Sequence, residues 1–407
     1  MTQPLAGIKV VEAATWVMAP TASGVMAEWG ADVIKIEHPE LGDPSRKLRS
    51  RSLVSTPAPL NVNFFHANRN KRSLGLNIAT PQGHELLLRL VETADVFLTN
   101  FLPPTRRKLR IDVDDLRAVN PRLIYARGSA LGPKGEESER GGYDYATFWC
   151  RTGIADSLRP GPGVYPPVMP TGAMGDMTTG AFLAGAISAA LLQRDRTGQP
   201  AVVDASLLAT GTWMMAANVA AAAGDHQPYL MNRLDRMAPV NPVVNIFRTG
   251  DDRHIVLCLL QADWAWPEFC GLVDRPDLAD RFIGLADLQA HSPEITAELD
   301  ALFATRTLEQ WRAALAPGRG VWEVVQDVAE VAGDPQVLAN GYIRPLAGAD
   351  PMVGAPSHLV AAPVQFDEQA TDLVAAPELG QHTEDILLDL GYDWDQIGSL
   401  KDDKIII

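Results

Sequence analysis

The sequence predicts an α/β protein whose main sheet is mostly parallel and covered by helices on both faces. From Ile8 to Gly128, short apolar runs alternate with segments of helical periodicity, which is the pattern of repeated β-α-β units. The chain has 407 residues and 46% of them are hydrophobic, so it is long enough for two domains and for a large core. Prolines and a Thr-Gly-Asp-Asp turn between Pro239 and Asp252 then open a second, α+β region.

The expected elements of the first region follow in a regular order. Four apolar runs are expected to be strands, and the segments between them have helical character. The expected strands are Ile8–Val11, Val33–Glu37, Asp95–Thr99 and Leu123–Gly128, and the expected helices are Ala22–Trp29, Pro81–Ala94 and Val113–Val119. Ligands of such sheets gather at the carboxyl ends of the strands, so a site is expected there.

The rest of the chain is less periodic. A Gly- and Pro-rich stretch from Gly128 to Gly180 is long enough for a functional loop. We expect helices to follow at Thr178–Arg194 and Asp204–Ala223, then a strand at His254–Leu260 with Trp-rich helices after it. A further helix is expected near Glu384–Leu390.

A nicotinamide cofactor has little support in the sequence. The turn after the first expected strand, Glu12–Pro20, contains no GxGxxG. Glu37 stands where a ribose-binding acid would be, but without the glycines the pyrophosphate could not approach the helix N-terminus. The eight histidines and three cysteines show no metal-binding spacing, and no GxSxG motif is present.

Charge and composition restrict the partners. The formal net charge of -15 argues against a nucleic-acid or anionic-membrane surface. The first twenty residues lack a basic start followed by an apolar run, so we expect a cytoplasmic protein. Ala205–Gly224 has no charge, but it is rich in Ala, Gly, Thr and Met rather than Leu and Phe, which favours a buried helix over a membrane span.

The sharpest local pattern is Gly172–Gly180, where Asp176 stands directly before an apolar helical segment. Aspartate is a favoured N-cap, so the capping interpretation is open. In the functional interpretation, the helix N-terminus keeps the Asp176 carboxylate ionised at neutral pH, and glycines such as Gly175 let a substrate approach. An ionised carboxylate beside free backbone N–H groups suits covalent catalysis on a thioester.

Two basic clusters, Arg46–Arg51 and Arg106–Arg110, stand out in this acidic chain. They are either solvated surface or a site for the phosphates of a nucleotide-like cofactor.

Motifs along the whole chain resemble the class III CoA-transferase family, which includes formyl-CoA, carnitine and bile-acid CoA-transferases and shares its fold with the 2-methylacyl-CoA racemases. Their order and spacing carry the resemblance. They are Pro4–Glu12, Ala31–Glu37, Asn70–Ser73, Ala94–Phe101, Gly142–Asp144, Gly175–Asp176, Leu379–Glu384 and Leu390–Tyr392.

The resemblance implies a discontinuous architecture. Residues 1–203 and 330–407 would form a Rossmann-like CoA-binding domain, 204–224 a linker helix, and 225–329 an inserted smaller α+β domain. Two chains would interlock like rings into a homodimer.

The resemblance also implies the chemistry. Asp176 would move CoA from an acyl-CoA to a carboxylic acid through an acyl anhydride and an enzyme–CoA thioester. CoA and acyl-CoA would be substrates, with no permanently bound cofactor and no metal. A binding-only paralogue that recognises acyl-CoA without turnover is the alternative from another class.

Expected contacts with CoA follow from the same resemblance. They are Thr15, Val17, His38, Leu76, Asn77, Asn100, Phe101 and Lys108. A family lysine falls on Ala79 and a family glutamine on Val17, so the phosphates are expected to be held by Arg46, Arg49 or Arg106.

Tyr143 separates the transferase from the racemase interpretation. In the racemases a histidine stands at this position and acts as an acid/base group, whereas a phenol, with a reference pKa of about 10, is a poor base at neutral pH. Transfer is therefore favoured over racemisation. Trp16, Trp149 and Trp213 are candidates for lining an apolar acyl pocket near Asp176.

Overall fold

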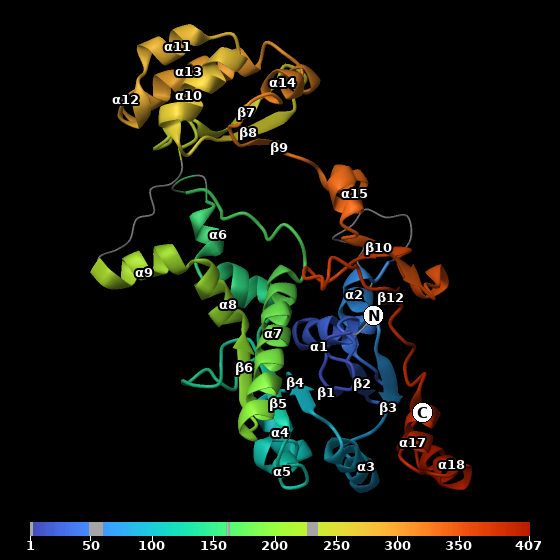
Figure 1. Cartoon of the computed structure of the whole chain (residues 1–407). Helices are drawn as coiled ribbons and strands as arrows, with labels where there is room; N and C mark the ends of the chain where they lie inside the picture. The colour runs from blue at the N-terminus through green and yellow to red at the C-terminus, as the bar shows by residue number, and fades with distance from the viewer. Residues whose placement is uncertain (1–2, 49–59, 160, 162, 226–234) are drawn as a thin grey trace. The chain divides into compact units, whose positions relative to one another are not determined.

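The computed structural model describes all residues except 1–2, 49–59, 160, 162 and 226–234. It divides into two compact units (Figure 1). Unit 1 comprises Met1–Tyr229 and Pro335–Ile407, and unit 2 comprises Leu230–Asp334. Arg49, one of the residues expected to hold a phosphate, lies outside the described residues.

Unit 1 is built on a six-stranded sheet with the order β3-β2-β1-β4-β5-β6, in which every pair of neighbours is parallel. The predicted parallel sheet is therefore confirmed, and its order changes direction between β1 and β4. The strands are β1 (Lys9–Ala13), β2 (Asp32–Glu37), β3 (Arg72–Gly75), β4 (Val96–Thr99), β5 (Ile124–Ser129) and β6 (Val202–Ser206).

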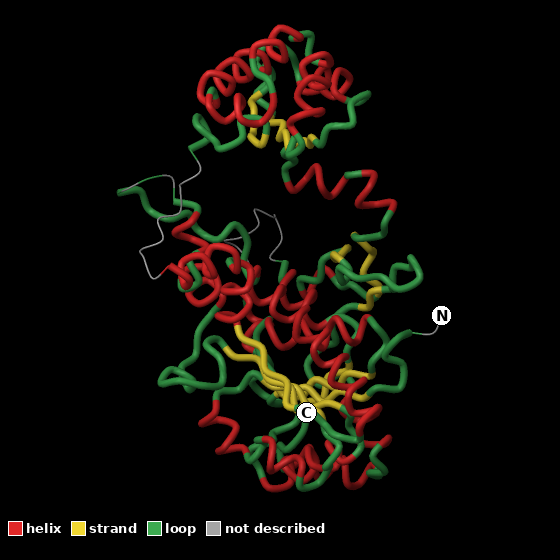
Figure 2. Tube along the Cα trace, turned by 60° about the vertical axis from the view of Figure 1, so that its left-hand side comes forward, coloured by secondary structure: helices red, strands yellow, loops and turns green. Residues whose placement is uncertain are grey.

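Helices cover both faces of this sheet, and Figure 2 shows its strands between two helical layers. Because side chains alternate along a strand, Val10 and Ile124 face one layer while Val11 and Tyr125 face the other. The first layer contains α1 (Met18–Glu28) and α7 (Met174–Thr197). The second contains α3 (Pro81–Glu92), α5 (Val113–Arg117), α17 (Thr383–Asp389) and α18 (Trp394–Asp402).

Shorter elements complete unit 1. The strands β11-β10-β12 form a second sheet, and its core residues pack with Phe64 and Phe65 of α2. The remaining elements are η1 (Pro44–Lys47), α2 (Val62–Asn68), α4 (Pro103–Leu109), η2 (Tyr145–Cys150), α6 (Ile154–Ser157), α8 (Leu207–Met214), α9 (Ala216–Asp225), α16 (Pro335–Ala339), β10 (Ile343–Ala347), η3 (Pro351–Val353), β11 (His358–Val360) and β12 (Leu373–Val374).

The single helix expected at Asp204–Ala223, given above as a linker at 204–224, is wrong. Residues up to Ser206 belong to β6, which pairs with β5 from Tyr125 onward. The chain then forms α8 and α9, which meet at an angle of 83°. Backbone pairing with the sheet edge decides the conformation of Asp204–Ser206, and this long-range constraint is invisible in the local periodicity.

Among the described residues, α7 is the one helix long and apolar enough to cross a membrane by length and composition, and the bent pair α8–α9 passes the same test if taken as one span. Core helices also pass it. Leu183, Ala184 and Ile187 of α7 are fully buried against the sheet, so we interpret α7 as a core helix of unit 1.

Unit 2 combines an antiparallel sheet, β7-β8-β9, with helices. Its core contains Trp266 and Trp311 with the stacked rings of Phe247 and Phe303, whereas Trp264 is exposed. Its elements are β7 (Val244–Arg248), β8 (His254–Cys258), α10 (Ala262–Leu272), α11 (Pro276–Arg281), α12 (Gly284–Ala290), α13 (Ser292–Phe303), α14 (Leu308–Leu315), β9 (Trp322–Val324) and α15 (Val328–Gly333).

The C-terminal helices are part of the core under the sheet, so we predict that Leu387→Ala destabilises unit 1. Leu387 is 0% exposed, and its removal should lower the free energy of unfolding by about 2–5 kcal/mol. The adjacent Leu388, 37% exposed, provides the matched control, and Leu388→Ala should change it by less than about 1 kcal/mol. Urea unfolding followed by circular dichroism measures both, and equal losses would contradict the packing described here.

Candidate active site

A cavity of about 760 Å³ opens at the carboxyl ends of the strands on both sides of the switch point. The loops after β1, β4 and β5 line it, together with residues 138–143, Ala146 and Asp176 in the first turn of α7. The expected residues that it brings together are Thr15, Trp16, Asn100, Phe101, Arg106, Tyr143 and Asp176. The position agrees with the rule for open α/β sheets that ligands bind where the strand order reverses.

Two hydrogen bonds join the loops on either side of the switch point. The Thr15 backbone N–H donates to Asn100 Oδ1 over 3.0 Å, and Asn100 Nδ2 donates to the Thr15 carbonyl over 2.7 Å. Asn100 therefore acts as a bridge that fixes the β1 loop relative to the β4 loop. This contact indicates that both residues shape the cavity wall.

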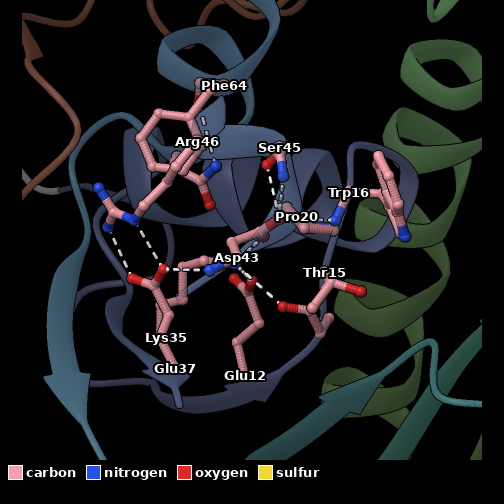
Figure 3. A network of polar contacts seen from close by, with 12 residues as sticks. Glu12, Thr15, Trp16, Pro20, Lys35, Glu37, Asp43, Ser45, Arg46 and Phe64 are labelled. Atoms are coloured by element: carbon pink, nitrogen blue, oxygen red, sulfur yellow. Dashed lines mark hydrogen bonds and ion pairs between the residues drawn. The ribbon is translucent and has the colours of Figure 1, made fainter. Parts of the chain in front are cut away.

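Trp16 has an unusual backbone conformation, with φ at +67°. For a bulky residue such a φ costs on the order of 1–3 kcal/mol and persists only where surrounding contacts impose it. The Trp16 N–H donates to Asp43 Oδ1 over 3.1 Å, and the ring meets Tyr143 edge-on, with centroids 5.4 Å apart and planes at 81° (Figure 3 shows Trp16 and Asp43). Both rings line the cavity that contains Asp176.

Asp176 lies in the first turn of α7 but does not cap it. The N-cap is Ala173, with φ at +64° and no side-chain cap, so the capping interpretation of Asp176 is wrong. Among the described residues, no side chain or backbone group makes a hydrogen bond or ion pair with the Asp176 carboxyl group. The carboxyl group is therefore available to a ligand in the cavity.

The ionisation expected for Asp176 needs correction. Burial and the neighbouring Asp144 carboxylate raise the pKa of Asp176 to about 7. The helix N-terminus favours the charged form, but loss of hydration and a like charge outweigh it here. At neutral pH the carboxyl group is thus divided between its protonated and ionised forms instead of being fully ionised.

Asp144 is the functional neighbour that sequence reasoning missed. It is buried at the start of η2, where Oδ1 accepts the Tyr145 N–H over 2.8 Å, and Oδ2 has no hydrogen-bond partner in the described structure. Burial raises the pKa of Asp144, although backbone N–H groups of Tyr145, Gly175 and Asp176 oppose the rise. The signal in the sequence was the Gly142–Asp144 motif, which carried part of the family resemblance but gave Asp144 no role.

Gly175 serves packing instead of substrate approach, which corrects the expectation from sequence. It is buried, and a Cβ at this position would lie 2.5 Å from Cγ of Phe148. Glycine therefore allows the first turn of α7 to contact the Phe148 ring. Trp149 is likewise buried, with Nε1 donating to the Pro167 carbonyl over 2.9 Å, and it does not line the cavity.

The remaining expected CoA contacts divide into two groups. His38, Leu76 and Asn77 line a second, smaller cavity of about 160 Å³, whose wall includes Phe101 of the first cavity. Val17 is buried in a small apolar cluster, and Lys108 is exposed; neither lines the two cavities. Trp213 is exposed and packs edge-on against Phe182, so it is not a wall of the first cavity.

The basic side chains expected to hold phosphates are engaged within the protein. Arg46 forms two bonds to Glu37, of 2.7 and 2.6 Å, and lies over the Phe64 ring. Arg106 donates to Asp112 over 2.7 Å and to the Phe101 carbonyl over 2.8 Å, so it fixes Phe101 as well as lining the cavity. Arg107, which belongs to the Arg106–Arg110 cluster, also lines the cavity, and so does Arg140, which sequence reasoning missed.

A doubly wound parallel sheet with a large cavity at its switch point defines an α/β protein of the class that binds nucleotide-like ligands. Comparison with known proteins identifies the family within this class. The sequence profile of CoA-transferase family III matches residues 5–383, so the chain belongs to that family.

Two named relatives of this chain are CoA-transferases as well. The chain is 30% identical over 406 residues to (R)-2-hydroxy-4-methylpentanoate CoA-transferase of Clostridioides difficile, which covers 99% of each chain. It is 28% identical over 411 residues to cinnamoyl-CoA:phenyllactate CoA-transferase of Clostridium sporogenes, covering 100% of this chain and 98% of the relative.

Solved structures agree as well. The protein Rv3272 from Mycobacterium tuberculosis superposes with a TM-score of 0.79 at 29% identity, covering 94% of this chain and 98% of that one. A CaiB/BaiF family protein from Brucella suis gives a TM-score of 0.78 at 28% identity, covering 96% and 100%. The family resemblance found in the sequence is confirmed: the protein is a CoA-transferase that uses acyl-CoA, and the racemase alternative is not favoured.

We predict that Gly175→Ala disturbs the site through Phe148. Overpacking should destabilise the fold by about 1–3 kcal/mol, and a shift of about 1 Å in the first turn of α7 should lower kcat/KM by on the order of 100-fold. Gly185→Ala in the same helix is the control: no atom lies within 4 Å of its added Cβ, so it should stabilise by up to about 1 kcal/mol. Thermal unfolding and steady-state kinetics measure both, and a fully active, stable Gly175→Ala variant would contradict the constraint.

Proposed function

We propose that the protein transfers CoA from an acyl-CoA to a carboxylic acid with Asp176 as the nucleophile. The observation that carries the proposal is the Asp176 carboxyl group on the wall of the switch-point cavity, unbonded to other described residues. Tyr143 and Trp16 form an aromatic wall of the same cavity. Thr15, Asn100 and Phe101 on the first cavity, with His38, Leu76 and Asn77 on the second, are the proposed CoA contacts.

The proposed reaction has four bond exchanges at carbonyl carbon. The Asp176 carboxylate attacks the donor thioester, the C–S bond breaks, and CoA thiolate leaves behind an acyl anhydride. The thiolate attacks the Asp176 carbonyl carbon, which releases the donor carboxylate and forms an enzyme–CoA thioester. The acceptor carboxylate displaces CoA to form a second anhydride. The thiolate then attacks the acceptor carbonyl, which releases the new acyl-CoA and the free Asp176 carboxylate.

For the substrates, we propose a larger, partly apolar acyl group. Trp16, Met18 and Tyr143 give the cavity apolar and aromatic surface. Arg107 and Arg140 on its wall are exposed and paired with surface glutamates, and they supply positive charge for an acceptor carboxylate. The two relatives described above act on 2-hydroxy-4-methylpentanoate and on cinnamoyl and phenyllactyl groups, as their names state. These acids combine a carboxylate with a branched or aromatic side chain, which suits such a wall.

For the assembly, we propose an interlocked homodimer in which unit 2 is the inserted smaller domain. Supporting observations are the exposed Phe182–Trp213 pair, with ring centroids 5.2 Å apart, and the exposed side chains of Met214 and Leu192 nearby in the chain. Large apolar surface of this kind is typical of an interface. A cytoplasmic location is also proposed, on the acidic net charge and the free state of Cys150, Cys258 and Cys270.

We predict that Asp176→Asn lowers the rate of CoA transfer by more than about 10³-fold while the fold is retained. With the wild-type protein and an accepted acyl-CoA, hydroxylamine should convert the Asp176 peptide to a hydroxamate, as detected by mass spectrometry. The folded state holds the Asp176 pKa above its unfolded value, so the free energy of unfolding decreases as pH rises toward about 7. Asp176→Asn should therefore raise the melting temperature at pH 8 but not at pH 4. Retained turnover in the variant would refute the mechanism, and CoA binding without turnover by the wild type would favour the binding-only alternative.

We also predict a pH profile governed by the carboxyl pair. Since the nucleophile must be ionised, kcat/KM should fall tenfold per pH unit below about 7. Asp144→Asn removes a neighbouring negative charge and should shift this limb to lower pH, although burial still keeps the Asp176 pKa above its ordinary value. Glu136→Gln removes an equal charge from an exposed residue outside the cavity wall and is the control. An unchanged limb in Asp144→Asn would show that the two carboxyl groups are not coupled.

A further inference from the structure

A buried network of charged side chains lies next to Trp16, a residue of the cavity wall (Figure 3). Lys35 is its centre: Nζ donates to Glu12 over 2.8 Å and to the Ala14 carbonyl over 3.0 Å, and it lies 2.9 Å from Asp43 Oδ2. Lys71 adds a second ammonium 2.7 Å from Glu12. Burial opposes ionisation of Glu12, but the two ammonium groups outweigh it and lower the pKa of Glu12 to about 2. Glu12 therefore stays ionised at neutral pH, and Lys71, whose pKa burial lowers to about 8, stays mostly protonated.

Asp43 is the member of this network that reaches the cavity loop. It is 1% exposed, and its Oδ1 accepts three donors: the Trp16 N–H over 3.1 Å, the Ser45 N–H over 2.8 Å and the Ser45 hydroxyl over 2.6 Å. Its own N–H donates to Glu37 over 3.0 Å. Hydrogen bonds thus fix Oδ1, while Oδ2 has no hydrogen-bond partner among the described residues and is held by its ion pair with Lys35.

The chemistry of these contacts requires a carboxylate. One oxygen faces only donors and the other faces an ammonium group, so both must be acceptors. An amide could satisfy one side and would turn its NH₂ group toward a donor on the other. Asp43 therefore has two roles: it neutralises the charge of Lys35, and it accepts a hydrogen bond from the N–H of Trp16, whose backbone has a positive φ.

We propose that Asp43 is a positioning residue that holds Trp16 against Tyr143 and thereby sets which acyl groups fit beside Asp176. The proposal rests on the function proposed above. Trp16 keeps a φ of +67° because Asp43 fixes its N–H from one side and Asn100 fixes the preceding Thr15 from the other. Its ring then forms the cavity wall with Tyr143, and no part of Asp43 lines that cavity.

The first test needs no activity. In Asp43→Asn, amide hydrogen exchange in the peptide that contains Thr15 and Trp16 should accelerate by about tenfold or more. An amide that keeps its oxygen on the Trp16 N–H turns its NH₂ group toward the Lys35 ammonium, so this acceptor is no longer held in place. Glu28→Gln is the matched control: Glu28 is also buried and paired with an arginine, Arg69, but it bonds Ala362 instead of the β1 loop. In Glu28→Gln, the peptide that contains Trp16 should exchange as in the wild type. Equal acceleration in both variants would refute a specific effect of Asp43.

The second test uses selectivity. We expect Asp43→Asn to lower kcat/KM about tenfold or more for branched or aromatic acyl-CoA donors and less than about threefold for acetyl-CoA. If Asp43 acts through Trp16, the selectivity change should disappear when Asp43→Asn is made in a Trp16→Ala background, since the two effects are then non-additive. Additive effects, or equal losses for all donors, would overturn the proposal.

Two further outcomes separate this proposal from the proposed function. A wild type that transfers CoA while Asp43→Asn leaves both selectivity and exchange unchanged refutes only the positioning role. A wild type inactive with every thioester refutes the proposed function, and the exchange experiment still decides whether Asp43 holds Trp16. If Asp43→Asn does not fold, Ser45→Ala removes one of the bonds that orient the carboxylate, and it should change exchange and selectivity in the same direction by a smaller factor.

Discussion

The cavity depends on the ion pairs that the buried ammonium group of Lys35 makes with Glu12 and Asp43. This ammonium group joins Glu12 and Ala14, at the end of β1, to Asp43, in the segment after β2. A buried charge is tolerated only while it is paired, and removing one partner costs about 3–5 kcal/mol. The loop after the central strand therefore cannot relax into a more common backbone conformation without breaking this pairing, which is how a tryptophan with positive φ is retained.

The strand order places this constrained loop at the point of the sheet where a ligand can bind. Because β1 and β4 are neighbours with helices leaving to opposite sides, their loops diverge and leave space between them. Asn100 spans that space and fixes its width. Asp176 reaches the same space through the packing of α7 on α1, where Gly180 would place a Cβ 2.6 Å from the Met18 carbonyl. Close helix packing and the loop bridge together determine the position of the carboxyl group.

The sequence predicted the elements whose evidence is local. β2, β4, β5 and α3 lie within two residues of their expected bounds, because buried parallel strands are continuous apolar runs and amphipathic helices are periodic. β6 was mistaken for helix, and β3, which begins with Arg72 and Ser73, was not expected, since pairing with a distant strand decides both.

For the site, the sequence indicated Asp176, Tyr143 and the two loops, but not what surrounds them. Arg46 and Arg106 were expected to bind phosphates because a cluster of charges is visible in a sequence and its partners are not. Glu37 neutralises the charge of Arg46, and another N–H of the Arg46 guanidinium donates to the carbonyl of Pro377, far along the chain. Burial and the closeness of Asp144, which set the pKa of Asp176, likewise arise only after folding.

The raised pKa of Asp176 has a chemical consequence for the proposed reaction. When a carboxylate attacks a thioester, the tetrahedral adduct expels whichever group is the weaker base. An ordinary aspartate, with a pKa near 3.9, is a far better leaving group than a thiolate whose thiol has a pKa of about 8.5, so the adduct would mostly revert. At a pKa of about 7 the two groups differ in acidity by only about 1.5 orders of magnitude. The burial that leaves Asp176 partly protonated at neutral pH therefore also makes its anhydride easier to form, and Asp144 contributes to both effects.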